Sequence, residues 1–112
     1  MLKTENQNGV LIVRLEDTDR LHALNAEKVK AGLNDIFTTP GTKLILDLIG
    51  IEFIDSTGFG VLLSAMKTAH QNQGKFLITG ISEEVMGLFK LLQLHHVFDI
   101  YSSKEDALKS FN

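Results

Sequence analysis

Two adjacent hydroxyl groups in a glycine-rich segment are the side chains of this sequence whose types and spacing best suit chemistry. The segment is Asp55-Ser56-Thr57-Gly58-Phe59-Gly60, placed between an apolar stretch and a helical pattern of apolar residues. Glycine lets the backbone turn sharply or approach another surface closely, and the unpaired N–H groups at a helix start attract anions. An anion on the hydroxyl of Ser56 or Thr57 would be stabilised there. The segment is therefore the loop of this sequence that could carry chemistry.

The same residues also have a purely structural interpretation. Ser, Thr and Asp are common helix N-caps, so Ser56 or Thr57 could cap the following helix, with Asp55 as a further candidate. Spacing alone favours capping, and the two interpretations stay open at this point.

Nucleotide binding and serine hydrolysis are disfavoured by missing residues. Gly58-Phe59-Gly60 begins like a dinucleotide fingerprint, but Leu63 stands where that motif has its third glycine, and no G-x-x-x-x-G-K-[ST] motif is present. A hydrolase using Ser56 would need G-x-S-x-G and partners for proton transfer. His22 is the only histidine that we place near the segment. We therefore expect a protein without catalytic residues.

Metal binding and aspartyl phosphorylation are disfavoured as well. The side chains of the adjacent His95 and His96 point differently, and no ligand at helical spacing completes a set with them. Asp47 ends a buried strand, as the phosphoacceptor of response-regulator receivers does, but Phe76–Gly80 lacks the lysine that receivers need. We expect Asp47 to bond to a neighbouring loop, and we expect no metal and no cofactor.

Length and composition limit the protein to one small domain. The chain has 112 residues, no cysteine, 14 acidic and 11 basic residues, and a formal net charge of -3. A chain of this length builds one sizeable core and not two, so we expect a single domain over residues 1–112. Without cysteine there are no disulfides and no thiolate sites, which suits a reducing compartment.

The distribution of charged and apolar residues points to protein partners. The polar start of the chain has no apolar signal segment, and no uncharged apolar run approaches the ~20 residues that span a bilayer. Lysine and arginine are scattered singly, without the basic stripe that binds nucleic acid or anionic lipid. We expect a cytoplasmic protein that binds other proteins, with no nucleic acid and no membrane insertion.

Apolar periodicity predicts alternating strands and helices around the candidate segment. The strands are expected at residues 2–5, 10–15, 43–49, 76–79 and 97–101, and Asn8-Gly9 predicts a hairpin between the first two. Four helices are expected, with N-caps at Asn25, in the candidate segment, at Ser82, and at Ser102, which forms a capping-box spacing with Glu105.

This order predicts an α/β domain with a mixed sheet of about five strands and about four helices. Strands that alternate with helices form mostly parallel sheets, and the N-terminal hairpin adds an antiparallel strand at one edge. Lys43–Ile49 is apolar almost throughout, which is typical of a central strand covered on both faces.

The sequence resembles the STAS domain family, the sulfate-transporter and anti-sigma-factor-antagonist family. Leu44-Ile45-Leu46-Asp47-Leu48 and, after a short turn, Phe53-Ile54-Asp55-Ser56-Thr57-Gly58-Phe59-Gly60-Val61-Leu62-Leu63 look like its signature. The likeness extends to the N-terminal hairpin, the helix after Asn25, the Gly80-Ile81-Ser82 turn and the closing Phe98–Tyr101 strand. The resemblance implies a STAS-like sheet with helices mainly on one face.

The resemblance also implies a function. In anti-sigma factor antagonists of this family, the Ser after the Asp is phosphorylated by an anti-sigma factor that is an ATP-dependent serine kinase. That residue is Ser56 here, with Thr57 as second choice. The unphosphorylated protein binds the anti-sigma factor, the phosphorylated one releases it, and a cognate phosphatase resets the switch. The implied phospho-loop and partner contacts are Asp55, Thr57, Gly58, Phe59 and Gly60.

One loop departs from the family pattern. Many members carry a Gly-Glu-Leu-Asp-like loop after the second strand, where this chain has Glu16–Asn25. His22 stands at the place of the usual Asp, and Asp19 could substitute for it. Because this loop lies near the phosphoacceptor in the family, it is a candidate partner-contact loop, with Asp19, Leu21, His22 and Asn25 as its residues.

An alternative function belongs to a different class. Some stand-alone STAS proteins are accessory subunits that dock onto membrane-transport ATPases, and such a subunit would be indifferent to phosphate. The sequence predicts neither the partner's identity nor an oligomeric state.

Overall fold

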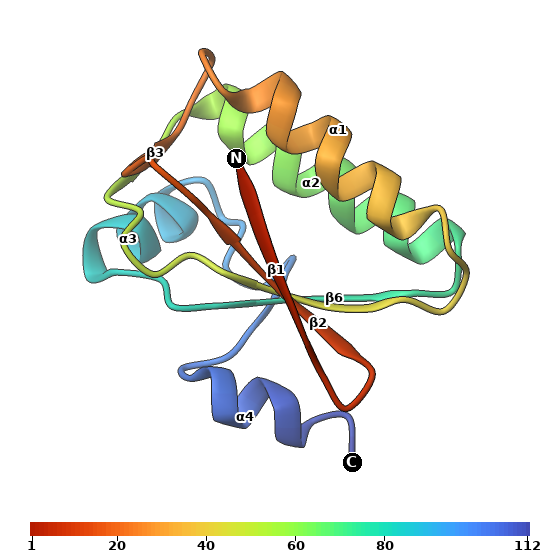
Figure 1. Ribbon diagram of the computed structural model, residues 1–112. Coiled ribbons are helices and arrows are strands. Elements are labelled where there is room, and N and C mark those ends of the chain that lie inside the picture. The colour runs from red at the N-terminus through yellow and green to blue at the C-terminus, as the bar shows by residue number, and fades with distance from the viewer.

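Three strands come before the first helix in the computed structural model, which describes residues 1–112, and strands and helices are interspersed from there on (Figure 1). The elements are β1 (Leu2–Gln7), β2 (Val10–Leu15), β3 (Arg20–Leu21), α1 (Ala26–Phe37), β4 (Lys43–Asp47), β5 (Phe53–Ile54), α2 (Ser56–Gln71), β6 (Lys75–Thr79), α3 (Glu83–Leu91), β7 (Asp99–Ile100) and α4 (Lys104–Lys109). No helix has the length and apolar character needed to cross a membrane.

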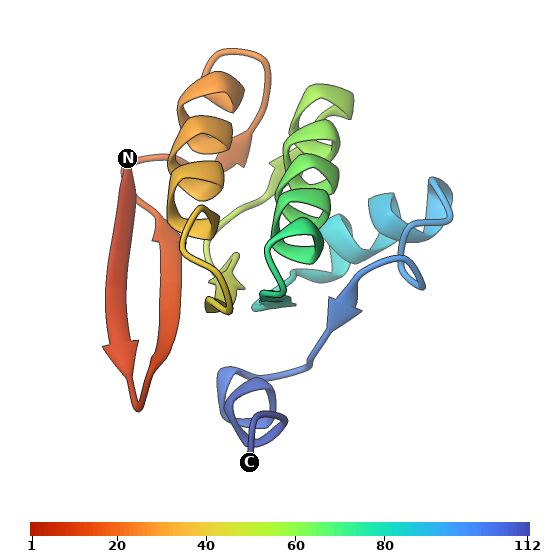
Figure 2. The ribbon, with the colours of Figure 1, turned by 90° about the vertical axis from the view of Figure 1, so that its right-hand side faces the viewer.

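Five strands form the main sheet in the order β1-β2-β4-β6-β7. β1 and β2 are antiparallel, and every other pair in this sheet is parallel. Figure 2 shows the hairpin of β1 and β2 at one edge of the sheet. The predicted mixed sheet, mostly parallel with an N-terminal edge hairpin, is confirmed.

The hairpin turn has the backbone that its sequence predicts. Asn8 and Gly9 have φ angles of 54° and 85°, in the left-handed region that asparagine and glycine tolerate best. The turn fixes the register so that Gln7 pairs with Val10 and Leu2 pairs with Leu15. As a result β1 runs to Gln7, two residues beyond the predicted end.

Helices cover both faces of the main sheet, and most of them lie on one face. In Figure 1, α1 and α2 lie above the sheet and α4 lies below it. Leu44 and Leu46 of β4 pack into the larger core, which includes residues of α1, α2 and α3, whereas Ile45 packs into a smaller cluster with Ala107 of α4. Alternate residues of a strand face opposite sides, so the continuous apolar run of β4 is explained by two cores.

A chain of aromatic rings joins α2 to the rest of the core. Phe59 of α2 packs edge-to-face on Phe89 of α3, with 4.9 Å between ring centroids. Phe89 packs on Phe98, Phe98 on Phe76, and Phe76 on Phe37 in the same way. Such pairs stabilise a core beyond their area alone. They hold the first turn of α2 against α3.

Three expected helix starts have different outcomes. Ser82 caps α3 as predicted, because its Oγ accepts the N–H of Val85 at 3.1 Å. The cap of α4 is Ser103, which accepts the N–H of Asp106, and not Ser102, whose hydroxyl donates to the Asp106 side chain. Asn25 occupies the cap position of α1, but its side chain accepts no helix N–H.

Two strand predictions were also imprecise. The last strand is only Asp99–Ile100, shorter than the predicted 97–101, because only these two residues pair with β6. A second, two-stranded sheet of β3 and β5 was not predicted at all. Segments of two residues show no apolar periodicity, so the sequence gives no signal for them. This small sheet nevertheless positions the candidate site.

Candidate functional site

Asp55 caps α2. Of the three candidates for this cap, which were Asp55, Ser56 and Thr57, it is the one that the structure selects. Its Oδ1 accepts a hydrogen bond from the N–H of Gly58 at 2.8 Å, and its carbonyl oxygen accepts from Phe59 at 3.0 Å. The backbone of Asp55 is extended, with φ of -90° and ψ of -178°, as expected for an N-cap. Ser56 is therefore the first residue of the helix.

The side chains of Ser56 and Thr57 are left free by this cap. Both residues are exposed, and neither hydroxyl forms a hydrogen bond within the protein. Their backbone N–H groups have no partners in the helix, because the first turn has no preceding carbonyls. Two accessible hydroxyls thus lie at the positive end of a 16-residue helix.

The Asp55 carboxylate also joins this segment to the loop before α1. Its second oxygen, Oδ2, accepts the N–H of Ala23 at 3.1 Å. Asp55 further donates its own N–H to the carbonyl oxygen of Leu21 at 3.1 Å. The family resemblance implied only that the two loops lie near each other, and the structure brings them into direct contact.

The pairing of β3 with β5 explains how the loops meet. The two strands are parallel, with Leu21 opposite Ile54, and both side chains are fully buried. Gly58 packs tightly against this pair: a Cβ at that position would lie 2.5 Å from the carbonyl oxygen of Leu21 and 2.8 Å from Cγ2 of Ile54. Only glycine allows the first turn of α2 to approach β3 so closely.

Asn25 organises the loop instead of capping its helix. Its Oδ1 accepts the N–H of His22 at 3.0 Å, and its Nδ2 donates to the carbonyl oxygen of Arg20 at 2.9 Å and to Thr18. The side chain is almost completely buried. A buried polar group needs such partners, and here they fix the loop backbone from residue 18 to 25.

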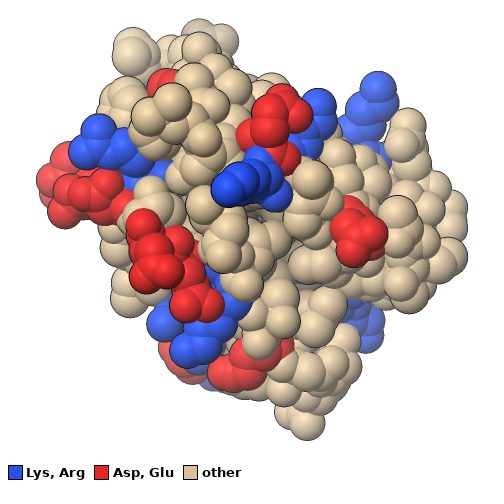
Figure 3. All heavy atoms as spheres, turned by 45° about the horizontal axis from the view of Figure 1, so that its top comes forward, with Lys and Arg blue, Asp and Glu red and all other residues tan.

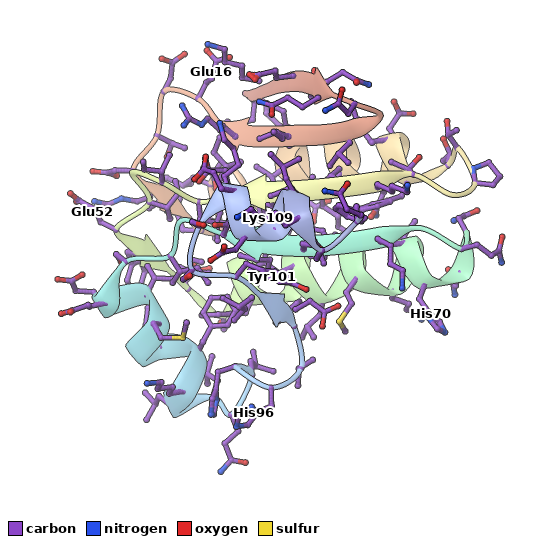
Figure 4. All side chains as sticks on the ribbon, turned by 90° about the horizontal axis from the view of Figure 1, so that it is seen from below. Glu16, Glu52, His70, His96, Tyr101 and Lys109 are labelled. Atoms are coloured by element: carbon purple, nitrogen blue, oxygen red, sulfur yellow. The ribbon has the colours of Figure 1, made fainter.

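Asp19 and His22 both lie in the loop before α1, and their contact with a partner stays a prediction. Asp19 is exposed and accepts a hydrogen bond from Nε of Arg20 at 3.0 Å. This hydrogen bond and the positive charge of Arg20 hold the pKa of Asp19 below its ordinary value. Its carbonyl oxygen accepts the N–H of Glu52, which lies at the periphery in Figure 4. His22 is half-buried and supports the loop through its backbone.

Several residues expected to contact a partner are buried. Leu21, Asn25, Gly58 and Phe59 are buried in the free chain, and their contact with a partner stays a prediction. Phe59 is a core residue because it packs on Phe89. Gly60 is exposed, with open space around the position of a Cβ.

Leu24 is an exposed residue that sequence reasoning missed. Its side chain is 88% exposed, although it lies between the hydrogen-bonded Ala23 and the buried Asn25. Phe53, the first residue of β5, and Ile49, which follows β4, are further exposed apolar residues, at 44% and 59%. The sequence signal was weak: Leu24 is an apolar residue that lies outside the stripe of the following helix.

Other candidate residues lie outside this site. Asp47 accepts a hydrogen bond from the N–H of Ile49 at 3.1 Å, as expected, and forms an ion pair with Arg14 at 3.2 Å. The rings of His95 and His96 lie against each other, with 3.9 Å between centroids and an interplanar angle of 41°, so the expectation that the two side chains point differently is wrong. No group of three or more histidine, aspartate or glutamate residues could hold a metal ion. Figure 4 shows His96 well apart from His70.

Charges of both signs surround the helices. On the face in Figure 3, acidic and basic side chains are interspersed and do not form a single basic patch.

Comparison with known proteins identifies the family. Residues 1–107 match the STAS domain family. The anti-sigma-B factor antagonist of Listeria monocytogenes is 30% identical over 96 residues, which cover 79% of this chain and 84% of that protein. The anti-sigma F factor antagonist of Paenibacillus polymyxa is 27% identical over 108 residues, covering 96% and 91%.

Solved structures agree with this assignment at the level of the fold. An anti-sigma-factor antagonist (STAS) domain protein from Planctomyces limnophilus superposes with a TM-score of 0.88 and 20% identity, covering 97% of this chain and 96% of that one. The chain belongs to the STAS domain family. Its curated relatives are anti-sigma factor antagonists, which are regulatory proteins.

Proposed function

We propose that this protein is an anti-sigma factor antagonist, and that phosphorylation of Ser56 switches its binding to an anti-sigma factor with serine kinase activity. The observation that carries the proposal is the position of Ser56. Its free hydroxyl directly follows Asp55, whose carboxylate holds the Ala23 loop and the first turn of α2 together. A cognate phosphatase would restore the unphosphorylated form.

The effect of a phosphate at Ser56 follows from its neighbours. Phosphoserine adds about -1.5 to -2 charges beside the Asp55 carboxylate. The unpaired N–H groups of Ser56 and Thr57 can stabilise this charge, so the fold tolerates it. The added bulk, the desolvation cost and the repulsion from acidic groups of a partner then oppose docking at the same surface. The switch is local.

The partner surface includes apolar side chains around the two joined loops. Leu24 projects from the Ala23 loop, and Phe53 precedes Asp55 by two residues on the exposed side of β5. Removing an exposed leucine side chain from water contributes about 1.5–3 kcal/mol, so a partner that covers Leu24 would gain affinity. The anti-sigma factor would cover Leu24 and Ser56 together.

The test compares capture of a kinase by the unmodified protein and its variants. A pull-down with the wild-type chain should retain a protein that contains an ATP-binding serine kinase domain. Ser56→Ala should retain it and Ser56→Asp should lose it. Thr39→Asp, which places the same charge on an exposed residue beyond α1, should bind like wild type. Equal retention by all four proteins would contradict the switch.

Phosphopeptide mass spectrometry distinguishes Ser56 from Thr57. After incubation with the captured kinase and ATP, we expect phosphate on Ser56. Retention of a membrane-transport ATPase in place of a kinase, with no phosphopeptide, would support the accessory-subunit alternative instead.

A further inference from the structure

β1 offers a long unpaired edge on the main sheet. It pairs only with β2, whereas the opposite edge is formed by the two-residue β7. Figure 4 shows β1 along one border of the sheet with no element beyond it, and Figure 2 shows the same edge open. An exposed strand edge of six residues is a template for pairing with another strand.

The pattern of hydrogen bonds shows which backbone groups face outward. The carbonyl oxygen of Met1 accepts the N–H of Glu16, so Met1 faces β2. Orientation alternates along an antiparallel strand, so Leu2, Thr4 and Asn6 direct their N–H and C=O groups toward the open edge. Thr4 lies at the centre of the strand.

We propose that two copies of this protein pair through β1 in antiparallel fashion, with the two-fold axis at Thr4. In this register Thr4 lies opposite Thr4 of the second copy, and Leu2 lies opposite Asn6. All these residues face outward, so the pairing forms about six N–H···O bonds. The two five-stranded sheets become one continuous sheet.

The charges on β1 support a second copy as the occupant of this edge. With the axis at Thr4, Lys3 of each copy lies directly opposite Glu5 of the other. These are non-hydrogen-bonded positions, where side chains approach most closely and opposite charges stabilise the pairing. An axis at Lys3 or at Glu5 would place like charges opposite each other. The charge pattern therefore selects the Thr4 register.

The surroundings of Lys3 favour a second carboxylate. Lys3, Arg14 and Lys104 line a shallow pocket of about 130 Å³ in which Glu5 is the only acidic lining residue. Asp47 already pairs with Arg14. Glu5 of the second copy would enter beside Lys3 and reduce the excess of positive charge.

The expected association is weak and concentration-dependent, because one strand pair buries less surface than stable dimer interfaces do. It is also separate from the phosphoserine switch, since Ser56 follows β5 of the small sheet. The proposal therefore stands or fails independently of the proposed function.

Sedimentation velocity over a concentration series tests the charge pairing. The wild-type chain should show a monomer–dimer equilibrium with a Kd below about 1 mM. Lys3→Glu places glutamates opposite each other and should raise the Kd at least about tenfold. The exchange Lys3→Glu with Glu5→Lys should restore dimerisation. Lys67→Glu, the same charge change on α2, should behave like wild type.

A backbone variant tests the strand edge itself. Thr4→Pro removes an outward N–H and leaves the bonds to β2 intact, as edge strands tolerate. It should abolish the dimer, whereas Thr4→Val, which keeps the N–H, should not. Circular dichroism must show that both variants are folded. A monomeric wild type at about 1 mM, or a dimer unaffected by the charge and proline changes, would overturn the proposal.

Discussion

The Oδ2 atom of Asp55 lies 3.1 Å from the backbone nitrogen of Ala23 and accepts its hydrogen bond. The two residues are far apart in the sequence, and no other side-chain hydrogen bond joins the loop before α1 to the start of α2. The same carboxylate caps α2 through Gly58. One side chain thus sets the relative position of Ser56 and the loop before α1.

Replacing Asp55 should separate its two roles. Asp55→Ala removes both hydrogen bonds and should lower the free energy of unfolding by about 1–2 kcal/mol, the usual cost of losing an N-cap. Asp55→Asn keeps an oxygen for Gly58, so the loss of stability should be smaller. Urea denaturation measures both values. In hydrogen exchange the amide of Ala23 should lose protection in the alanine variant, and unchanged protection would contradict the tether.

Gly58 and Gly60 form a matched pair of glycines in one helix. Gly58→Ala forces a Cβ to within 2.5 Å of the Leu21 carbonyl oxygen and should destabilise the protein by about 1–3 kcal/mol. Gly60→Ala meets open space and should stabilise it by about 0.5–1 kcal/mol through the helix propensity of alanine. Thermal or urea unfolding compares them. Equal effects of the two substitutions would show that the stability of the protein does not depend on the close approach of Gly58 to β3.

Leu24 should affect binding without affecting stability. Its side chain is 88% exposed, so Leu24→Ala should change the free energy of unfolding by less than about 0.5 kcal/mol. As an interface anchor, it should contribute at least about 2 kcal/mol to partner binding, a roughly 30-fold change in Kd. Leu91→Ala, at 77% exposure on α3, is the matched control and should bind normally. Wild-type affinity of the Leu24 variant would place the partner elsewhere.

The pKa of Asp19 predicts a small pH dependence. The Arg20 hydrogen bond and charge lower this pKa in the folded state, so unfolding raises it. The stabilisation of the folded state by ionised Asp19 is therefore complete when the pH is above the unfolded-state pKa. It is lost as the pH falls through the folded-state pKa. NMR titration should find a pKa below 3.8 in wild type and a value returned toward 3.8 in Arg20→Ala. An identical pKa in both proteins would contradict the pairing.

The main elements were predictable from the sequence because their signals are local. The hairpin depends on Asn8-Gly9, β4 on its continuous apolar run, and α3 on the Ser82 cap. The pairing of β3 with β5 was not predictable, since two-residue strands have no period and are held by contacts distant in sequence.

The candidate site was predictable only in part. The exposed hydroxyls of Ser56 and Thr57 lie at a helix start, as their position next to glycines predicted. The role of Asn25 was not predictable, because its side chain bonds to loop atoms that the sequence alone cannot place. Nor could the sequence distinguish an exposed Leu24 from a buried Leu21 in the same loop.

The most direct test of the switch is the affinity of the captured anti-sigma factor for the chain with and without phosphate on Ser56. Isothermal titration with the two purified forms gives both dissociation constants. We expect the phosphorylated form to bind at least about tenfold more weakly, a difference of about 1.4 kcal/mol. Equal affinities of the two forms would contradict the account.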